Sequence, residues 1–195
     1  MNSPYEQGYF RKKGWSRLAL AGTLQPLATM PTRQYRTNEQ IIDDLRVLAV
    51  SRIGNTIEIY PYFAGTVTYN GISKAKGACL AKGGMFIGLR LYYHDAFDGA
   101  VAMAHEVGHL HTMNREAIGQ YNSSTVATLS WERLASRWAL AWLRGRLNAN
   151  DLDRAERLLN AWLDSYYECY RVIPSDREHV HAGEPGQPEN ERGVA

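Results

Sequence analysis

Two histidines and a glutamate stand at the spacing of a metal-dependent hydrolase. His105, Glu106 and His109 form the pattern His-Glu-x-x-His, in a segment whose composition predicts a helix. Residues four apart on a helix lie one turn apart on the same face, so both imidazoles can reach a single Zn²⁺. Glu106 is rotated by about 100° from His105 and can hold the water that the metal activates. The pattern therefore predicts zinc-dependent hydrolysis, with Glu106 as the general base.

A catalytic zinc usually has three protein ligands and one open position, so the two histidines need a partner. Glu132 follows His109 by 23 residues, which is enough chain for a helix to end and a second helix to return. The helix face of Glu132 continues through Ala135 and Ala139, small residues that let two helices approach closely. Gly108 indicates tight packing on the first helix, since glycine costs about 1 kcal/mol of helix propensity. We therefore expect Glu132 to complete the zinc site.

The residues around both helices resemble the ImmA/IrrE family of metallopeptidases. The first segment reads Ala104-His105-Glu106-Val107-Gly108-His109-Leu110, and the second reads Glu132-x-x-Ala135-x-x-Trp138-Ala139-x-x-x-Leu143. Trp138 stands where the family usually has Phe, and Ser136 stands where Asn or Asp is usual. The likeness covers residues 38–145. It implies that His105, His109 and Glu132 bind zinc and that Glu106 is the general base.

Members of that family commonly act on DNA-binding repressors. The resemblance therefore implies a cytoplasmic zinc endopeptidase that takes part in transcription regulation, with a helix-turn-helix repressor as its protein substrate. A second interpretation is a regulatory protein, an antirepressor or toxin-like, that keeps the metallopeptidase fold and binds a partner without cleaving it. The intact Glu106 favours the enzyme. A purely structural pair of helix histidines is the remaining interpretation of the motif.

The charge distribution leaves nucleic-acid binding as a third and weaker class. Residues 1–36 carry six basic side chains and one acidic, whereas residues 174–195 carry two basic and five acidic. The residues between them carry 14 of each sign and are neutral. A basic arm can touch nucleic acid, but a neutral folded part offers no further attraction for phosphates, so nucleic acid is disfavoured as a partner.

Other residues are candidates for parts of the site by their type. Donors for the oxyanion of a tetrahedral intermediate could come from a histidine or a tyrosine near the motif, and the candidates are Tyr121, His94, Tyr92 and Tyr93. His111 lies two residues after His109 and should point to nearly the opposite side. His179 and His181 are expected to be solvated. The segment Met85–Tyr93 could be an exposed edge strand that binds a peptide in extended form, or an ordinary core strand.

The order of predicted elements indicates an α+β domain, and the family resemblance implies that it is of the zincin-like kind. It consists of an N-terminal helix, a small antiparallel sheet, the motif helix and two further C-terminal helices. The helices are expected at 39–51 after a cap at Asn38, from about Gly99 to Met113 after Asp95 or Asp98, from Thr128 or Ser130 to about Leu147, and from Asn150 or Asp151 to about Val172. The strands are expected at Thr56–Phe63, Thr66–Tyr69, Gly77–Ala81 and Met85–Tyr93, with a turn at Asn70-Gly71 and a loop over 114–128.

Length and composition set the remaining bounds. The chain of 195 residues fits one domain with tails: a basic arm at 1–36, the metallopeptidase-like domain at 37–173 and a disordered tail at 174–195. No run of 18 apolar residues predicts a membrane span, and the N-terminus is a poor signal peptide. Cys79 and Cys169 form no Cys-x-x-Cys pair, which favours two buried thiols in a reducing, cytoplasmic setting.

Overall fold

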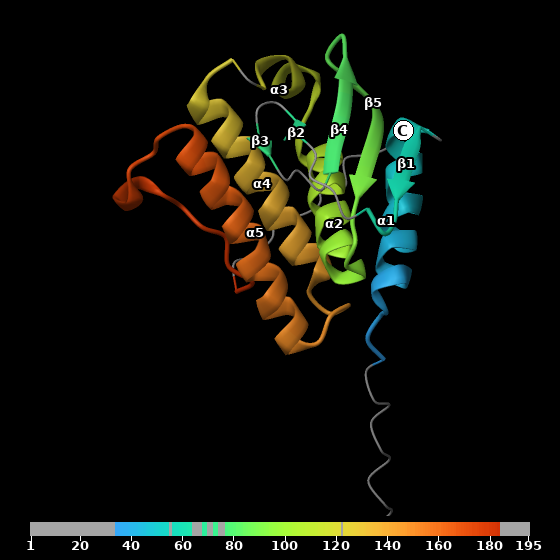
Figure 1. The fold of residues 1–195 in the computed structure, drawn as a ribbon. Coiled ribbons are helices and arrows are strands. Elements are labelled where there is room, and N and C mark those ends of the chain that lie inside the picture. Colours follow the sequence, from blue (N-terminus) through green and yellow to red (C-terminus); the bar gives the residue numbers. More distant parts are fainter. Residues whose placement is uncertain are drawn as a thin grey trace, which may run out of the picture. The chain divides into compact units, whose positions relative to one another are not determined.

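The structure is a computed structural model, and it describes residues 34–54, 56–63, 68–69, 72–73, 77–121 and 123–183. Nearly all of the expected basic arm lies outside the described residues, as do residues 184–195. Helices and a small mixed sheet make up the described part, so the α+β class is confirmed (Figure 1). The elements in chain order are α1 (Asn38–Ile53), β1 (Ile57–Tyr60), β2 (Thr68–Tyr69), β3 (Ile72–Ser73), β4 (Gly77–Lys82), β5 (Met85–Tyr92), α2 (Ala96–Thr112), α3 (Arg115–Gln120), α4 (Thr125–Leu143), α5 (Ala149–Cys169) and the 3-10 turn η1 (Pro174–Asp176).

Helix α2, which carries the His-Glu-x-x-His motif, is the centre of the core. It contacts α1, α4 and α5 as well as strands β4 and β5 (Figure 1). Its residues from Gly99 to Leu110 are all buried, because the run Ala100–Ala104 offers small side chains that allow neighbours to approach from every side. Helix α1 packs here through Ile41, Ile42 and Leu45. The motif therefore lies on a helix that is buried along most of its length.

The main sheet is mixed, and this corrects the expectation of an antiparallel sheet. Its strand order is β1-β5-β4. β4 and β5 form the expected antiparallel hairpin, joined through Gly83 and Gly84, both of which have the positive φ that favours glycine. β1 runs parallel to β5, with Ile57 paired to Leu89, because the chain between them crosses over instead of turning back.

Two strand predictions change as a consequence. β5 lies in the middle of the sheet, so Met85–Tyr93 is not an edge strand. Within the part of the chain that the structure describes, the outer edge next to α2 belongs to β4. The strand expected at Thr66–Tyr69 does not extend this sheet, because β2 pairs only with β3 in a separate two-stranded sheet. The Asn70-Gly71 turn expected between them lies outside the described residues.

Most helices begin earlier than the sequence patterns predicted. Each helix starts after a polar side chain that accepts a hydrogen bond from a backbone amide in the first turn. Such an amide has no acceptor within the helix, so the side chain supplies one. The observed caps are Thr37 for α1, Asp95 for α2, Asn114 for α3, Ser124 for α4 and Asn148 for α5. Asp95 was one of two predicted candidates, whereas Asn38, Thr128, Ser130, Asn150 and Asp151 are not the caps. The predicted loop at 114–128 also contains the short helix α3.

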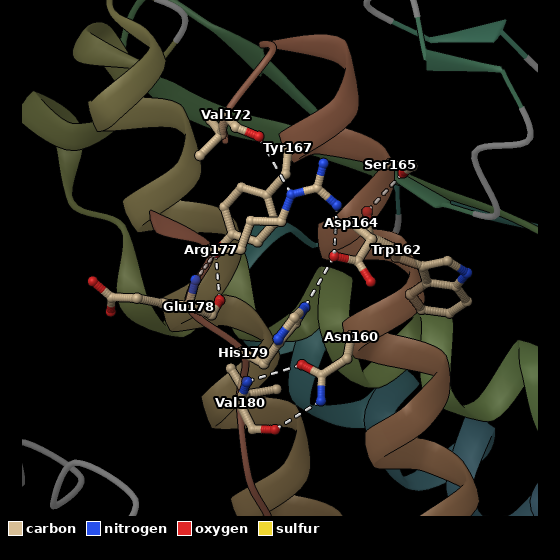
Figure 2. A network of polar contacts seen from close by, with 10 residues as sticks. All are labelled: Asn160, Trp162, Asp164, Ser165, Tyr167, Val172, Arg177, Glu178, His179 and Val180. Carbon is tan, nitrogen blue, oxygen red and sulfur yellow. Dashed lines mark hydrogen bonds and ion pairs between the residues drawn. The ribbon is translucent and has the colours of Figure 1, made fainter. Parts of the chain in front are cut away.

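The first ten residues of the expected disordered tail are ordered against α5 (Figure 2). We call residues 174–183 the C-terminal strap. Val180 is fully buried, and Asn160 of α5 both donates to and accepts from its backbone at 2.9 Å. His179 lies 3.0 Å from Asp164. The expectation of disorder is therefore wrong for the strap.

The two histidines of the strap are also not merely solvated. His179 pairs with Asp164, and His181 lies 3.0 Å from Glu156.

Of the two cysteines, Cys79 is partly buried, but Cys169 is exposed, which corrects the expectation of two buried thiols. None of the helices in the described residues is long and apolar enough to cross a membrane.

Candidate metal centre

His105, His109 and Glu132 come together in the core. The histidines lie on α2 and the glutamate on α4, and one nitrogen or oxygen from each lies within 4.8 Å of the others. His105 Nε2 is 3.0 Å from Glu132 Oε2, and His109 Nε2 is 3.5 Å from Glu132 Oε1. Ligands at about 2.0–2.1 Å in tetrahedral geometry stand roughly 3.3 Å apart, so these separations fit a zinc ion. The three residues predicted as ligands thus form a group that could hold a metal.

A close contact between backbones brings the two helices to this separation. A Cβ atom on Gly108 would lie 2.5 Å from the carbonyl oxygen of Ala135 and 3.0 Å from its Cα. Neither backbone atom can move aside easily, so only glycine fits at this position of α2. Ala135 and Ala139 on the facing side of α4 are fully buried. The predicted tight packing of small residues is confirmed at Gly108, and it places Glu132 over the histidines.

A hydroxyl group orients the first histidine. Ser136 is fully buried, and its Oγ lies 3.1 Å from His105 Nδ1, so Nε2 is the nitrogen left to face Glu132. Such a partner on the second ring nitrogen fixes the orientation and tautomer of a metal-binding histidine. The short side chain of Ser136 is thus long enough to reach the ring. His109 Nδ1 is buried and has no hydrogen-bond partner among the described residues.

The two histidines set the pKa of Glu132. Burial alone would raise the pKa of this carboxyl, since a charge loses its hydration in the core. The charge of His109 and the hydrogen bonds from both histidines outweigh burial and hold the pKa of Glu132 well below its usual range. An ionised carboxylate that is 1% exposed therefore faces two imidazole nitrogens. A metal ion would take the place of the protons on the imidazoles, since two neutral imidazoles and one carboxylate are a common donor set for catalytic zinc.

Glu106 lies beside the group but is not part of it. Burial raises the pKa of Glu106 to about 7, opposed by the charge of His105 and assisted by that of Glu132. Strand β4 covers it closely: a Cβ on Gly77 would lie 2.5 Å from Glu106 Cγ. The thiol of Cys79 also donates to the backbone carbonyl of Glu106 at 3.1 Å. A carboxyl group held in this way, with its pKa near neutrality, is suited to exchange protons.

Two tyrosines complete the polar side of the site. The Tyr121 hydroxyl, at the end of α3, donates to Glu132 Oε1, and Tyr166 of α5 lines the same cavity. Burial and then the charge of Glu132 raise the pKa of both phenols far above the usual value. Tyr121 was one of the predicted oxyanion donors. Tyr166 was not among the candidates, because no local pattern in the sequence indicates that it lines the cavity.

The other candidates named from the sequence do not reach the site. Tyr92 stacks on Tyr60 with ring centroids 5.0 Å apart, and Tyr93 packs where a Cβ of Gly99 would be. His94 is exposed before the first turn of α2. His111 stacks on Trp138 at 4.8 Å and is not in the metal-binding group, as predicted.

A cavity of about 240 Å³ opens next to the candidate ligands. Its polar part is formed by Glu106, His109, Glu132 and the two tyrosines. Gly77, Ala78, Cys79 and Ala81 of β4 line another side, so the edge of the sheet borders the same space. Apolar side chains, among them Phe86, Met113 and Ile118, close the remainder. The arrangement could hold a metal ion, a water molecule and one residue of an extended chain.

Comparisons of the chain with models of protein families, with curated proteins and with solved structures gave no match.

Proposed function

We propose that the protein is a zinc-dependent endopeptidase that hydrolyses a peptide bond in a protein partner. The observation that carries the proposal is the buried group of His105, His109 and Glu132, with Glu106 beside it in the same cavity. A structural metal site would need no open space and no adjacent carboxyl group with a raised pKa. The donor set fits zinc, and the open cavity fits a site at which a substrate replaces water.

In this proposal the metal ion and Glu106 have separate roles in hydrolysis. A bound zinc would act as a Lewis acid on water and on the scissile carbonyl. Glu106 accepts a proton from the water molecule as the water oxygen forms a bond to the carbonyl carbon. When the carbon–nitrogen bond breaks, Glu106 delivers that proton to the leaving amine. One water is consumed, and Glu106 ends in the state in which it began.

The edge of β4 supports an extended substrate. β4 borders the cavity, and among the described residues it pairs only with β5, so its other edge has no partner strand there. A peptide could add to this edge through main-chain hydrogen bonds, as in other cases of strand addition. The sequence left Met85–Tyr93 as either a peptide-binding edge strand or a core strand, and because β5 lies in the middle of the sheet, we propose β4 as the strand that binds the peptide.

The identity of the partner rests on the resemblance to the ImmA/IrrE family. We propose a DNA-binding repressor of the helix-turn-helix type, and hence a role in transcription regulation inside the cell. The competing proposal is a regulatory protein that binds such a partner without cleaving it. The buried Glu106 next to the ligands favours the enzyme, because a protein that only binds its partner has no need of a general base.

One set of variants tests metal binding and cleavage separately. We expect one zinc per chain by elemental analysis, and we expect this zinc to be lost in Glu132→Ala and in His105→Ala. Glu106→Gln is nearly isosteric and should keep both the zinc and the fold while abolishing hydrolysis.

The cleavage assay works even when the substrate is not identified in advance. Wild-type and Glu106→Gln proteins are each incubated with a native cell extract, and new protein N-termini are mapped by mass spectrometry. We expect termini that only the wild type generates. Equal cleavage by both proteins would refute the role of Glu106, and no cleavage by the zinc-loaded wild type would favour the regulatory protein that only binds. Full zinc occupancy in Glu132→Ala would refute the three-ligand site.

A further inference from the structure

The cavity beside the candidate metal centre has an apolar end, for which the hydrolytic steps have no use. This end is formed by Phe86 of β5, Met113 after α2, Ile118 of α3, and Ala78 and Ala81 of β4. Apart from the weakly accepting sulfur of Met113, the side chains of these five residues offer no hydrogen-bond donor or acceptor. We call these five residues the apolar pocket.

The apolar pocket begins one helical turn away from the metal-binding group. Met113 follows His109 by four residues, and its amide donates to the His109 carbonyl at 3.0 Å. Ile118 comes three residues before Tyr121, whose hydroxyl donates to Glu132. Residues three or four apart on a helix lie on the same face, about one turn or 5.4 Å apart. A side chain that starts beside a carbonyl at the metal centre can therefore extend into the pocket.

The wall that carries Ile118 packs directly on the sheet. Phe86 pairs with Ala81 next to the turn of the β4–β5 hairpin. A Cβ on Gly84, in that turn, would lie 2.9 Å from Arg115 Cγ and 3.3 Å from the Arg115 carbonyl oxygen, so the first turn of α3 lies against the hairpin. The end of α2, the helix α3 and the hairpin thus form the pocket together, and its size is set by the fold.

A pocket of this composition selects a side chain by polarity and by size. A polar side chain would lose its hydrogen bonds to water there and would gain none in return. An aliphatic or aromatic side chain would leave water for apolar contacts, which is favourable. A glycine would place nothing in the space. The chemistry of the lining therefore favours Leu, Ile, Met or Phe at this position of a substrate.

We propose that the apolar pocket binds the side chain of a large apolar residue next to the scissile bond, and that Met113 and Ile118 determine the size it accepts. The proposal rests on the proposed peptidase function and defines its substrate class. Large apolar residues are mostly buried in folded proteins. The partner must therefore present the bond in an extended segment that its own core does not bury.

Four hydroxamates, which bind zinc directly, test the polarity and size of the pocket. They share one peptide-like backbone and differ in a single side chain beside the zinc-binding group: hydrogen, isobutyl, benzyl or carboxamidomethyl. Isobutyl and carboxamidomethyl have nearly the same shape, so this pair separates polarity from size. The Kd of each compound for the zinc-loaded protein is measured by isothermal titration calorimetry. Ratios of these Kd values cancel the strength of the bond between zinc and hydroxamate.

We expect the isobutyl and benzyl compounds to bind the wild type more than about 10-fold more tightly than the hydrogen compound, since one methylene can already bring that much in an apolar pocket. The carboxamidomethyl compound should bind roughly 5–150-fold more weakly than the isobutyl compound, because its amide is buried without a partner. The new N-termini mapped in a cell extract should show a large apolar residue at one fixed position beside the cleaved bond.

Two variants test the residues that set the size. Ile118→Ala and Met113→Ala each enlarge the pocket and should shift the preference from isobutyl towards benzyl by about 10-fold or more. Ile173→Ala is the matched control, because Ile173 is an exposed isoleucine outside the lining of the cavity, and it should keep the wild-type ratios. A wild-type ratio in either folded pocket variant would overturn the role of that residue.

Failure of the pocket and failure of the proposed function give different results. Equal affinity of the wild type for the isobutyl and carboxamidomethyl compounds, or for the isobutyl and hydrogen compounds, would overturn the apolar pocket. If the zinc-loaded protein shows the expected ratios but cleaves nothing in the extract, the peptidase function fails and the pocket remains as a binding site. If the protein takes up no zinc, the metal centre fails, and the assignment of the pocket fails with it.

Discussion

At the scale of single residues, the proposed general base is confined by the sheet as much as by its own helix. Glu106 follows a candidate ligand on α2, but its side chain lies under β4. Gly77 has no side chain, and the Glu106 side chain fills the space this leaves. The thiol of Cys79 donates a hydrogen bond to the backbone carbonyl of Glu106. The position of the carboxyl group relative to the metal-binding group therefore depends on a strand that carries no ligand.

Gly77→Ala tests this dependence. The added Cβ would lie 2.5 Å from Glu106 Cγ and 2.8 Å from Oε1, so the carboxylate has to shift. A shift on the order of 1 Å in a catalytic group can reduce the rate about 100-fold. We expect this loss of cleavage with the zinc content unchanged. Gly119→Ala is the control, because a Cβ there meets nothing within 4 Å. Undiminished cleavage by Gly77→Ala would show that the fit between Gly77 and Glu106 does not matter.

The residues differ in how far the sequence could reveal them. His105 and His109 are set by a helical spacing that is visible locally, and Glu132 could be found because small residues mark the helix face it shares. The contacts of Gly77 and Tyr166 with the site join elements far apart in the chain, and neither residue belongs to a local motif. Ser136 was visible as a departure from the family pattern, but only its position beside the His105 ring shows that it still reaches Nδ1.

At the scale of elements, the C-terminal strap shows how a polar segment can become ordered. Its composition of charged residues, proline and glycine is typical of a disordered tail. Order comes instead from α5, where the Asn160 amide pairs with the backbone of Val180 and the Tyr167 hydroxyl pairs with the backbone of Glu178 (Figure 2). Such pairing uses backbone groups, which every residue has, so composition alone does not indicate it.

Removing the strap should therefore destabilise the protein. A chain that ends at Ile173 loses the buried Val180, whose burial contributes roughly 1.5–3 kcal/mol. Each 1 kcal/mol shifts the melting temperature of a protein of this size by about 2–4 °C, so we expect a fall of roughly 3 to 12 °C. The measurement is thermal unfolding followed by circular dichroism. A chain that ends at Gly183 keeps every strap contact and should melt as the full chain does; equal melting of all three would contradict the role of the strap.

At the scale of the whole described chain, the fold class followed from the order of the elements, but the pairing of the strands did not. The strands expected at Thr56–Phe63, Gly77–Ala81 and Met85–Tyr93 follow from local patterns, and the structure has a strand in each of these ranges. The position of β5 between β1 and β4 depends on a crossover that no local pattern encodes. That one difference changes which strand borders the site, and so which strand could hold a substrate.

The substrate prediction follows from the position of β4. The cavity has room for little more than the reacting bond and one neighbouring side chain, so most of the affinity for a chain must come from elsewhere. Addition of an extended segment along β4, together with contacts outside the cavity, would supply it. A short peptide forms only part of these interactions, so its chain would be poorly positioned for reaction even when it binds.

We therefore expect the zinc-loaded protein to cleave a protein partner and to act slowly on short generic peptides. The measurement compares, for one cleavage site found by N-terminal mapping, the kcat/KM for the intact partner with that for a peptide of about ten residues that spans the same bond. The peptide should react more slowly, mainly through a lower kcat, because remote binding energy that positions the chain is missing. Equal values, or rapid and unselective cleavage of unrelated peptides, would mean that the site recognises the bond by itself and that β4 has no part in selecting the substrate.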